Sequence, residues 1–257
     1  MSQRDTLMSK DPGVEFQAGV FLVDKPVGLT SFSIVSRVRR ILGIKKVGHA
    51  GTLDPFATGL LIVCAGRPAT KLISRFMEGK KEYFATLCLG ITTETFDTEG
   101  EIVNRRSVGR LSEGEIEECL GRFRGLQLQV PPQYSALKHK GRPLYYYARR
   151  GIEVKKEPRK IDISLLERID GNHDLSGEEA ELRLRIVCSK GTYIRTVAAD
   201  IGEDLKCGAH LTALRRTKSG CFSIENSLTM DDFSAGDAKE RFLKKMFTVE
   251  EVCKLLQ

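Results

Sequence analysis

GHAGTLDPFATGLLIVCA, residues 48–65, is the stretch of this sequence that decides its fold. Glycines at 48, 51 and 59 permit a close approach between the backbone and a ligand. The apolar run Leu60–Ala65 predicts a buried strand directly after the loop. Such a strand would anchor the loop and hold Asp54 at the edge of a sheet.

Asp54 is the residue in this loop that can carry chemistry. A carboxylate held at a sheet edge can act as a nucleophile or as a general base. An Asp before a proline is also a common turn former, and spacing alone favours that second interpretation. The Walker pattern GxxxxGK[ST] is absent from the sequence, so the loop is not predicted to hold a nucleotide phosphate.

Working outward from this loop, strand and helix patterns alternate along the chain. We expect strands at Gly19–Asp24, Leu60–Ala65, Lys81–Gly90, Ile161–Ile169, Glu179–Cys188 and within Leu211–Ile224. We expect helices at Ser31–Leu42, Ser112–Phe123, Thr192–Leu205 and in a tail at Ala238–Leu256. Ser31 is the predicted cap of the first helix, and Gly43 its end. The fold class is therefore α/β of the α+β type, with a mixed, largely antiparallel central sheet flanked by helices.

Composition excludes several classes of protein. The 257 residues carry 41 Lys and Arg against 34 Asp and Glu, a net charge of +7 that suits a polyanionic partner. The longest apolar run is too short to cross a membrane, and the N-terminus has no leader pattern. Seven cysteines without a CxxC pair, and four scattered histidines, indicate a reducing cytoplasm, no disulfide framework and no metal site.

A second motif, CSKGTYIRT at residues 188–196, lies where a strand gives way to a helix. Gly191 and Thr192 fit a turn and a cap, and Tyr193 and Arg195 then project from the first turn. A cation at a helix N-terminus is unfavourable beside the helix dipole, so we expect Arg195 to have a carboxylate partner. A surface arginine reaching into water is the alternative.

A third segment, PPQYSALKHKGRPLYYYARRG at residues 131–151, mixes tyrosines with cations. We expect residues 126–157 to form an excursion from the main sheet. Cationic and aromatic side chains together suit phosphate binding and base stacking, so we expect an RNA contact here. Core filling is the alternative, which the clustering of four of the six tyrosines in this segment makes weaker. The predicted RNA-binding residues are Lys138, Lys140, Arg142, Tyr145, Arg149 and Arg150.

These motifs together resemble the bacterial TruB family of tRNA pseudouridine-55 synthases. The resemblance covers about residues 19–225 and rests on KPVGLTS, GHAGTLDPFATG, KEYFATLCLG, PPQYSALKHKGRPLYYYARRG and CSKGTYIRT, in that order. It implies isomerisation of uridine 55 in the TΨC loop of tRNA, which detaches the base and rejoins it through C5. The target base must first be flipped out of the RNA structure. None of these steps needs a metal or an organic cofactor.

The resemblance also implies roles for particular residues. Asp54 matches the catalytic aspartate, Arg195 the arginine that pairs with it, and Tyr83 the tyrosine that stacks on the uracil. His49 matches the histidine that enters the space left by flipped nucleotides. The other predicted substrate-binding residues are Lys25, Gly51, Thr52, Tyr193 and Leu214.

The chain is expected to depart from the family at its C-terminal end. Many members carry a PUA domain there, but only about 30 residues follow Ser227, which we expect to be too few for one. The predicted organisation is a flexible segment at 1–18, a catalytic domain at 19–228 whose insertion at 126–157 clamps RNA, and a helical tail at 229–257. We expect a cytoplasmic monomer that acts on the T stem-loop of tRNA, without a membrane or an obligate protein partner.

Two alternatives remain. The first is an RNA chaperone of the tRNA elbow in which catalysis is secondary. A chaperone that had lost catalysis should have lost Asp54, Tyr83 or Arg195, and all three are present. The second is the guide-RNA-dependent branch of the same superfamily, which normally carries the PUA domain and is therefore disfavoured.

Overall fold

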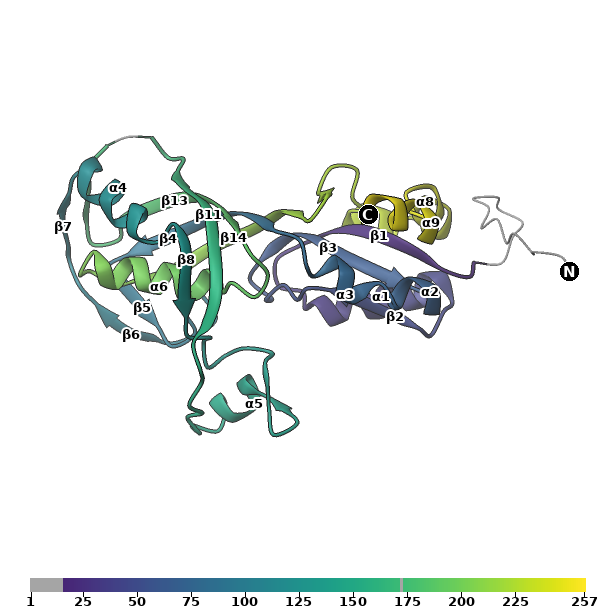
Figure 1. Ribbon diagram of the computed structural model, residues 1–257, viewed down its shortest axis with the longest axis horizontal. Coiled ribbons are helices and arrows are strands. Elements are labelled where there is room, and N and C mark those ends of the chain that lie inside the picture. The colour runs from purple at the N-terminus through teal and green to yellow at the C-terminus, as the bar shows by residue number, and fades with distance from the viewer. Residues whose placement is uncertain (1–15, 172) are drawn as a thin grey trace, which may run out of the picture. The chain divides into compact units, whose positions relative to one another are not determined.

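The computed structural model describes residues 16–171 and 173–257, and its chain divides into two compact units. Unit 1 joins residues 16–79 to residues 215–257, and unit 2 is the continuous stretch 80–214. Most of the flexible segment predicted at residues 1–18 lies outside the described residues. Figure 1 shows the elements of each unit.

Unit 1 is built on a strongly apolar antiparallel pair of strands. Strand β1 (Gly19–Lys25) pairs with β3 (Thr58–Ala65) from Gly19 opposite Ala65 to Lys25 opposite Gly59. Strand β2 (Val47–Ala50) pairs with the end of β3. Beside β3 runs the last part of β14 (Ala209–Ser219), in the parallel direction, with β15 (Phe222–Ser223) as its hairpin partner. The helices of unit 1 are α1 (Ser31–Leu42), α2 (Arg67–Thr70), α3 (Ile73–Phe76), α7 (Met230–Ser234), α8 (Ala238–Lys244) and α9 (Val249–Leu255).

The first helix was predicted with the right bounds and the wrong cap. Thr30 is its N-cap and accepts a hydrogen bond from the Ser33 amide. Ser31 is the first helical residue, and its buried hydroxyl points to the Asp54 loop instead. Gly43 ends the helix in the left-handed conformation, with φ of 67°, as predicted.

Unit 2 carries an antiparallel sheet of four long strands. Strand β4 (Lys81–Leu89) pairs with β13 (Glu181–Cys188), β13 with β11 (Arg159–Arg168), and β11 with β8 (Gly125–Gln129). The first part of β14 lies beside β4. Two short ribbons are formed by β5 (Ile91–Thr93) with β6 (Ile102–Arg105), and by β7 (Val108–Leu111) with β12 (Leu175–Gly177). Helices α4 (Glu113–Arg122) and α6 (Ile194–Asp204) complete the unit.

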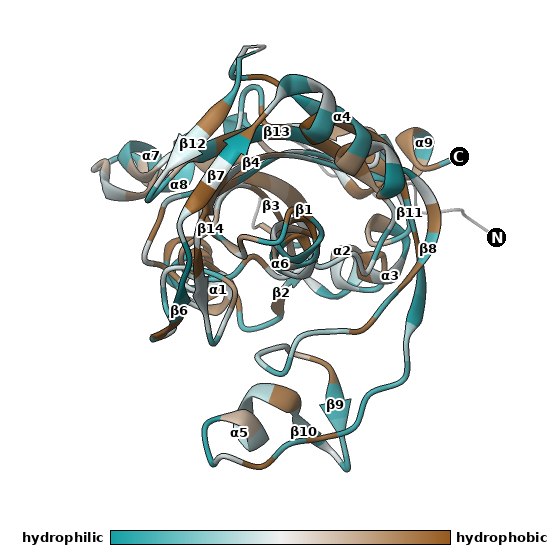
Figure 2. Cartoon of the chain, turned by 90° about the vertical axis from the view of Figure 1, so that its left-hand side faces the viewer, coloured by the Kyte–Doolittle hydropathy of each residue, from teal (hydrophilic) through white to brown (hydrophobic). Residues whose placement is uncertain are grey.

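The predicted excursion begins later than its sequence indicated. Residues 126–129 belong to β8, where they pair with β11. The insertion is therefore residues 130–158, which leave the sheet after Gln129 and return at Arg159, the residue opposite it. It contains β9 (Lys138–His139), β10 (Arg142–Pro143) and α5 (Leu144–Ala148). Figure 2 shows its short strands and α5 beyond the ends of β8 and β11.

The predicted fold class is confirmed. The pairings β1–β3, β4–β13, β13–β11 and β11–β8 are antiparallel, β3–β14 is parallel, and helices accompany the sheet. Two local expectations are wrong. The tail predicted as one helix at Ala238–Leu256 is two, α8 and α9, separated at Lys245–Thr248. The N-cap of α6 is Tyr193 and not Thr192. The Thr192 hydroxyl donates to the Ser189 carbonyl, before the helix. Within the described residues, no helix is long and apolar enough to cross a membrane.

Candidate active site

Asp54 lies in the loop that joins β2 to β3, and the residues on either side of it are fixed by buried bonds. The hydroxyl of Ser31 donates to the Leu53 carbonyl at 3.0 Å and accepts from the Leu53 amide at 2.9 Å. Ser31 and Leu53 are both buried, whereas Asp54 is half-buried. The loop therefore presents its carboxylate from a backbone that is already held in place.

Lys25 holds the other side of the same aspartate. It is fully buried, and its ammonium donates to the carbonyls of Pro26, Leu29 and Pro55, at 2.9, 2.7 and 3.3 Å. The Pro55 carbonyl also accepts from the Gly28 amide at 2.8 Å. Burying an ammonium is unfavourable unless its N–H groups donate to acceptors, and here the three carbonyls are those acceptors. Lys25, predicted to bind substrate, thus has a structural contact with the residue after Asp54.

Arg216, which the sequence analysis did not single out, joins the two ends of the loop. It lies on β14 and is 2% exposed. Its Nη2 donates to the Gly51 carbonyl at 3.0 Å and its Nε to the Leu60 carbonyl at 2.8 Å. Gly59, opposite Arg216 in the parallel pair, has a φ of 101°, and a Cβ there would lie 2.2 Å from the Arg216 carbonyl oxygen. This part of the loop therefore requires glycine.

Two further predicted residues lie on the same loop and strand. His49 is half-buried on β2. Burial, and then the charge of Arg216, lower the pKa of His49, so its ring is neutral at neutral pH. Thr52 is exposed, and Gly51 has a φ of 82°. Unit 1 thus gathers Lys25, His49, Gly51 and Thr52 around the loop that carries Asp54.

Arg195 is the second residue with a clear local structure, and it lies in unit 2. It is 4% exposed at the start of α6. Its Nη1 lies 3.4 Å from Oδ2 of Asp97 and donates to the Thr95 carbonyl at 2.8 Å. Its Nη2 donates to the carbonyl of Tyr134 at 2.7 Å. The expectation that this arginine has a carboxylate partner is met within unit 2 by Asp97, and the alternative of a surface arginine is wrong.

Asp97 is held as firmly as its partner. It is 1% exposed, and its Oδ1 accepts from the Thr95 hydroxyl at 2.5 Å and from the Glu99 amide at 2.9 Å. Phe96 before it has a φ of 61°, unusual for a residue with a side chain. The Thr95 hydroxyl and the Glu99 amide hold this buried carboxylate in place, and the carboxylate in turn fixes the guanidinium beside it. No sequence signal beyond its place in a turn marked Asp97.

The remaining predicted pocket residues of unit 2 are placed by its strands and by α6. Tyr83 lies on β4 opposite Ile186 and is 9% exposed, and Leu214 on β14 is 7% exposed. Tyr193 is half-buried, and both its amide and its carbonyl bond to the side chain of Gln129. Asp54 belongs to unit 1 and Arg195 to unit 2, so their pairing stays a prediction.

The predicted RNA-binding residues lie on the insertion, and all six are exposed. The guanidiniums of Arg142 and Arg150 lie 4.3 and 3.6 Å from the ring centroid of Tyr146. That of Arg149 lies 5.6 Å from the ring of Tyr145. Arg142 also donates to the Tyr146 hydroxyl and Arg150 to the Tyr146 carbonyl at 2.9 Å, and each exposed guanidinium has further N–H groups that can meet an anion.

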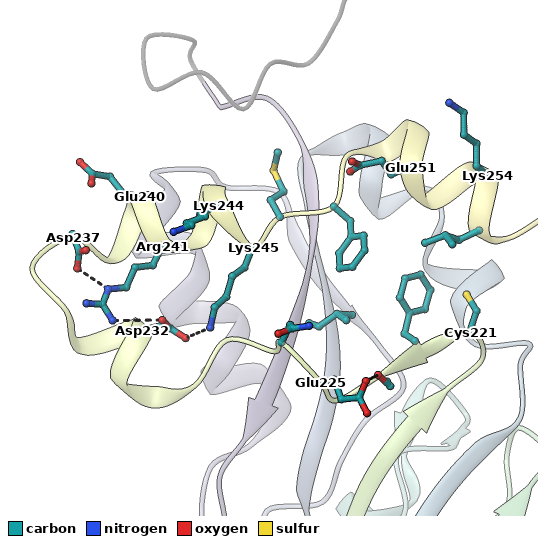
Figure 3. A pocket seen from close by; sticks show the side chains of 17 residues that line it. Cys221, Glu225, Asp232, Asp237, Glu240, Arg241, Lys244, Lys245, Glu251 and Lys254 are labelled. Carbon is teal, nitrogen blue, oxygen red and sulfur yellow. Dashed lines mark hydrogen bonds and ion pairs between the residues drawn. The ribbon is translucent and has the colours of Figure 1, made fainter.

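A groove of about 1210 Å³ also opens in unit 1, but none of the predicted site residues lines it. Four of its charged side chains pair with one another: Asp237 accepts from Arg241 at 2.8 Å, and Asp232 accepts from Lys245 at 2.9 Å (Figure 3). The rest of the lining mixes apolar side chains, such as Phe222 and Phe247, with polar and charged ones, such as Asn226. None of the residues that line this groove belongs to the Asp54 loop.

Two protein-family models match this chain one after the other. Residues 39–194 match the model of the TruB family pseudouridylate synthase N-terminal domain, and residues 195–252 match that of the tRNA pseudouridylate synthase B C-terminal domain. The chain is 65% identical to tRNA pseudouridine synthase B of Desulfotalea psychrophila, over 95% of this chain and 98% of that one. It is 44% identical to the protein of the same name from Syntrophus aciditrophicus, over 91% of this chain and 72% of the relative.

Solved structures are similar as well. A chain in the crystal structure of a Cbf5–Nop10–Gar1 complex superposes with a TM-score of 0.68 at 29% identity. The match covers 92% of this chain and 62% of the Cbf5-complex chain. A chain of an H/ACA ribonucleoprotein bound to a substrate RNA containing 2′-deoxyuridine gives a TM-score of 0.67 at 26% identity.

Proposed function

This chain belongs to the TruB family of pseudouridylate synthases, and from that premise we propose that it converts uridine 55 in the TΨC loop of tRNA to pseudouridine. The observation that carries the proposal is the Asp54 loop, in which Ser31, Lys25 and Arg216 fix the backbone on both sides of the half-buried aspartate. The names of the curated relatives, tRNA pseudouridine synthase B, support tRNA as the substrate.

We propose that Asp54 is the catalytic residue. The reaction breaks the bond between C1′ and N1, turns the uracil and forms a bond from C1′ to C5. C5 then loses its proton to solvent and N1 takes one up, so the product is an isomer of uridine. Attack on the base, attack on the sugar and removal of a ribose proton all require an ionised carboxylate. A loop fixed before the substrate binds avoids the cost of ordering the aspartate during the reaction.

Three other residues complete the proposed chemistry. The positive charge of Arg195 stabilises negative charge on the reacting groups, and Asp97 holds the arginine in place. Tyr83 stacks on the flipped uracil and takes part in the loss of the C5 proton. His49, neutral because of its lowered pKa, enters the space that flipping leaves in the RNA. Base flipping costs a few kcal/mol, which such contacts offset.

The RNA is held, in this proposal, by the insertion at residues 130–158. Its exposed arginines and lysines meet the phosphates of the T stem-loop, while the exposed ring of Tyr145 is available for stacking. We propose that the enzyme acts as a monomer and needs no protein partner.

Asp54→Asn tests the proposal. Tritium release is measured from a tRNA transcript labelled at uridine C5. Wild type should release about one equivalent per tRNA, and the variant should be slower by at least about 10³-fold. The variant should bind tRNA within about threefold of wild type, because the substitution preserves the size of the side chain.

A transcript with cytidine at position 55 is the control for the target site. Release from that transcript would contradict uridine 55 as the target. Wild type that binds tRNA, promotes its folding and releases no tritium would favour an RNA chaperone instead.

A further inference from the structure

Gln129 is a buried side chain that joins the base of the insertion to the start of α6. It is the last residue of β8 and is 5% exposed. Its Nε2 donates to the Tyr193 carbonyl at 3.1 Å, and its Oε1 accepts from the Tyr193 amide at 2.8 Å. The amide thus satisfies both main-chain groups of the N-cap residue of α6. Because the Gln129 side chain both donates to Tyr193 and accepts from it, it fixes the position of Tyr193 and of Arg195, which follows two residues later.

A second link runs from the insertion to the guanidinium of Arg195. Its Nη2 donates to the Tyr134 carbonyl, which lies in the entry segment of the insertion (residues 130–137). The same segment is bonded to α5: the Tyr145 amide donates to the Ser135 carbonyl at 3.1 Å, and the Leu144 amide to the Leu137 carbonyl at 2.7 Å. A displacement of α5 is therefore transmitted through two backbone bonds toward the acceptor of Arg195.

The entry segment also contains buried polar atoms whose bonding is incomplete. Among the described residues, Oγ of Ser135 and Oε1 of Gln133 have no hydrogen-bond partner, and neither does Oγ1 of Thr196 on α6. Ser135 is 4% and Thr196 6% exposed. An unsatisfied buried polar group destabilises the arrangement that leaves it without a partner. The entry segment, whose Tyr134 carbonyl accepts from Arg195, thus has buried polar atoms without partners. A bound RNA that moves the insertion can give these atoms hydrogen bonds.

We propose that Gln129 is a positioning residue that couples RNA binding on the insertion to the placement of Tyr193 and Arg195. The inference rests on the proposed function, since it concerns the RNA substrate of the same site. RNA bound to the cations around α5 shifts the entry segment, and Gln129 keeps the first turn of α6 in register with it. Gln129 is the member of this connection that can be tested by substitution, because the Tyr134 link uses backbone atoms.

The test uses Gln129→Ala, with Gln127→Ala as the matched control. Gln127 lies two residues earlier on β8, and its Nε2 donates to the Phe123 carbonyl instead of to α6. Under single-turnover conditions we expect Gln129→Ala to slow tritium release by about 10- to 100-fold. Its dissociation constant for tRNA should stay within about threefold of wild type. Gln127→Ala should change neither quantity by more than about threefold.

Hydrogen exchange supplies a readout that does not depend on catalysis. In wild type, binding of a T stem-loop RNA should slow exchange of the Tyr193 amide and of the first turn of α6. In Gln129→Ala the RNA should still bind but should leave this exchange unchanged. Wild-type protection without tritium release would contradict the proposed function and leave the coupling intact, so the two failures are distinguishable.

Gln129→Glu keeps the shape of the side chain and covers the case in which the alanine variant does not fold. Its carboxylate accepts from the Tyr193 amide but faces the Tyr193 carbonyl without a proton, which raises its pKa and weakens the second bond. Protonation restores the donor, so the rate relative to wild type should rise as the pH falls from 8 to 6. The proposal is overturned by an alanine variant with a normal rate, by weakened tRNA binding as its main defect, or by an equal loss in Gln127→Ala.

Discussion

The loop around Asp54 and the insertion at residues 130–158 both carry predicted site residues, and they satisfy their polar groups in opposite ways. Around Asp54, the cations Lys25 and Arg216 are buried, and they donate to carbonyls of the loop itself. On the insertion, the cations of Arg142 and Arg150 are exposed and lie against the ring of Tyr146. The first region buries its charges against its own backbone, whereas the second keeps its charges at exposed positions, where they can also meet another molecule.

This difference separates the requirements of chemistry from those of RNA binding. A reacting carboxylate has to be placed before the substrate arrives, since a displacement of about 1 Å can cost about 100-fold in rate. Contacts with phosphates tolerate motion, because they depend on the number of charges more than on exact geometry. Substitutions in the two regions should therefore affect different measurements.

The largest effect is expected for Arg216→Met, which removes a buried cation that fixes the Asp54 loop. The substitution removes the donors to Gly51 and Leu60 and leaves two carbonyls without these bonds inside unit 1. We expect the free energy of unfolding to fall by about 3 kcal/mol. Urea denaturation followed by circular dichroism measures it.

Arg215→Met is the control for this experiment, because the same substitution is made one residue earlier. Arg215 is 44% exposed in its side chain and pairs with Asp24 at 2.7 Å. An exposed ion pair contributes about 1 kcal/mol or less. A loss in Arg215→Met as large as that in Arg216→Met would show that burial of the arginine is not what fixes the loop.

A smaller effect, on binding rather than stability, is expected for Arg150→Ala. The guanidinium of Arg150 lies 3.6 Å from the Tyr146 ring centroid at an exposed position. We expect tRNA binding to weaken by about 3- to 10-fold, with the slope of log K against log salt reduced by about one. The free energy of unfolding should change by less than about 0.5 kcal/mol.

Filter binding at several salt concentrations measures this change, with Arg183→Ala as the control. Arg183 is an exposed arginine on β13 that pairs with Glu181 and is not predicted to meet RNA. An Arg150→Ala variant that loses stability and keeps its tRNA affinity would contradict the difference proposed between the two regions.

The smallest expected effect concerns the pH dependence of stability through His49. Burial and Arg216 lower the pKa of His49 in the folded chain, whereas an unfolded histidine titrates near 6.5. Below that pH the unfolded chain binds a proton that the folded chain does not, so stability falls as pH falls. His49→Gln should flatten this loss between pH 7 and 5, by under about 1 kcal/mol per pH unit.

Urea denaturation at a series of pH values, together with an NMR titration of the His49 ring, checks this prediction. A His49 pKa above 6.5 in the folded protein would reverse the sign and contradict the lowered pKa.

Much of the fold could be predicted because its elements follow simple periodicity. Alternation along Lys81–Leu89 places Tyr83 and Leu87 on one buried face, as expected. The capping box of Ser112 and Glu115 opens α4 where the pattern placed it. The start of the insertion was misjudged, since Leu126 and Leu128 are 84% and 66% exposed and gave no strand pattern, although β11 pairs with their backbone.

The candidate site was predictable in its motifs and not in its supporting residues. Asp54 and Arg195 stand in glycine-containing motifs at the ends of strands, which local sequence makes visible. Asp97, Gln129 and Arg216 act through partners that are 64 or more residues away in the chain, such as Asp97 with Arg195 and Gln129 with Tyr193. Periodicity marks Arg216 only as an inward position on β14, and it cannot say which carbonyls a buried arginine will meet.

The discontinuous chain path of unit 1 has a consequence for synthesis on the ribosome. Unit 2 is a single stretch and has all its residues once Leu214 has emerged. Strand β1 emerges first, yet its amides at Val20 and Asp24 bond to the carbonyls of Phe247 and Leu228. Strand β1 therefore lacks these partners until residues more than 200 positions further along the chain have been translated, so nascent unit 1 keeps an unpaired edge after unit 2 is able to fold.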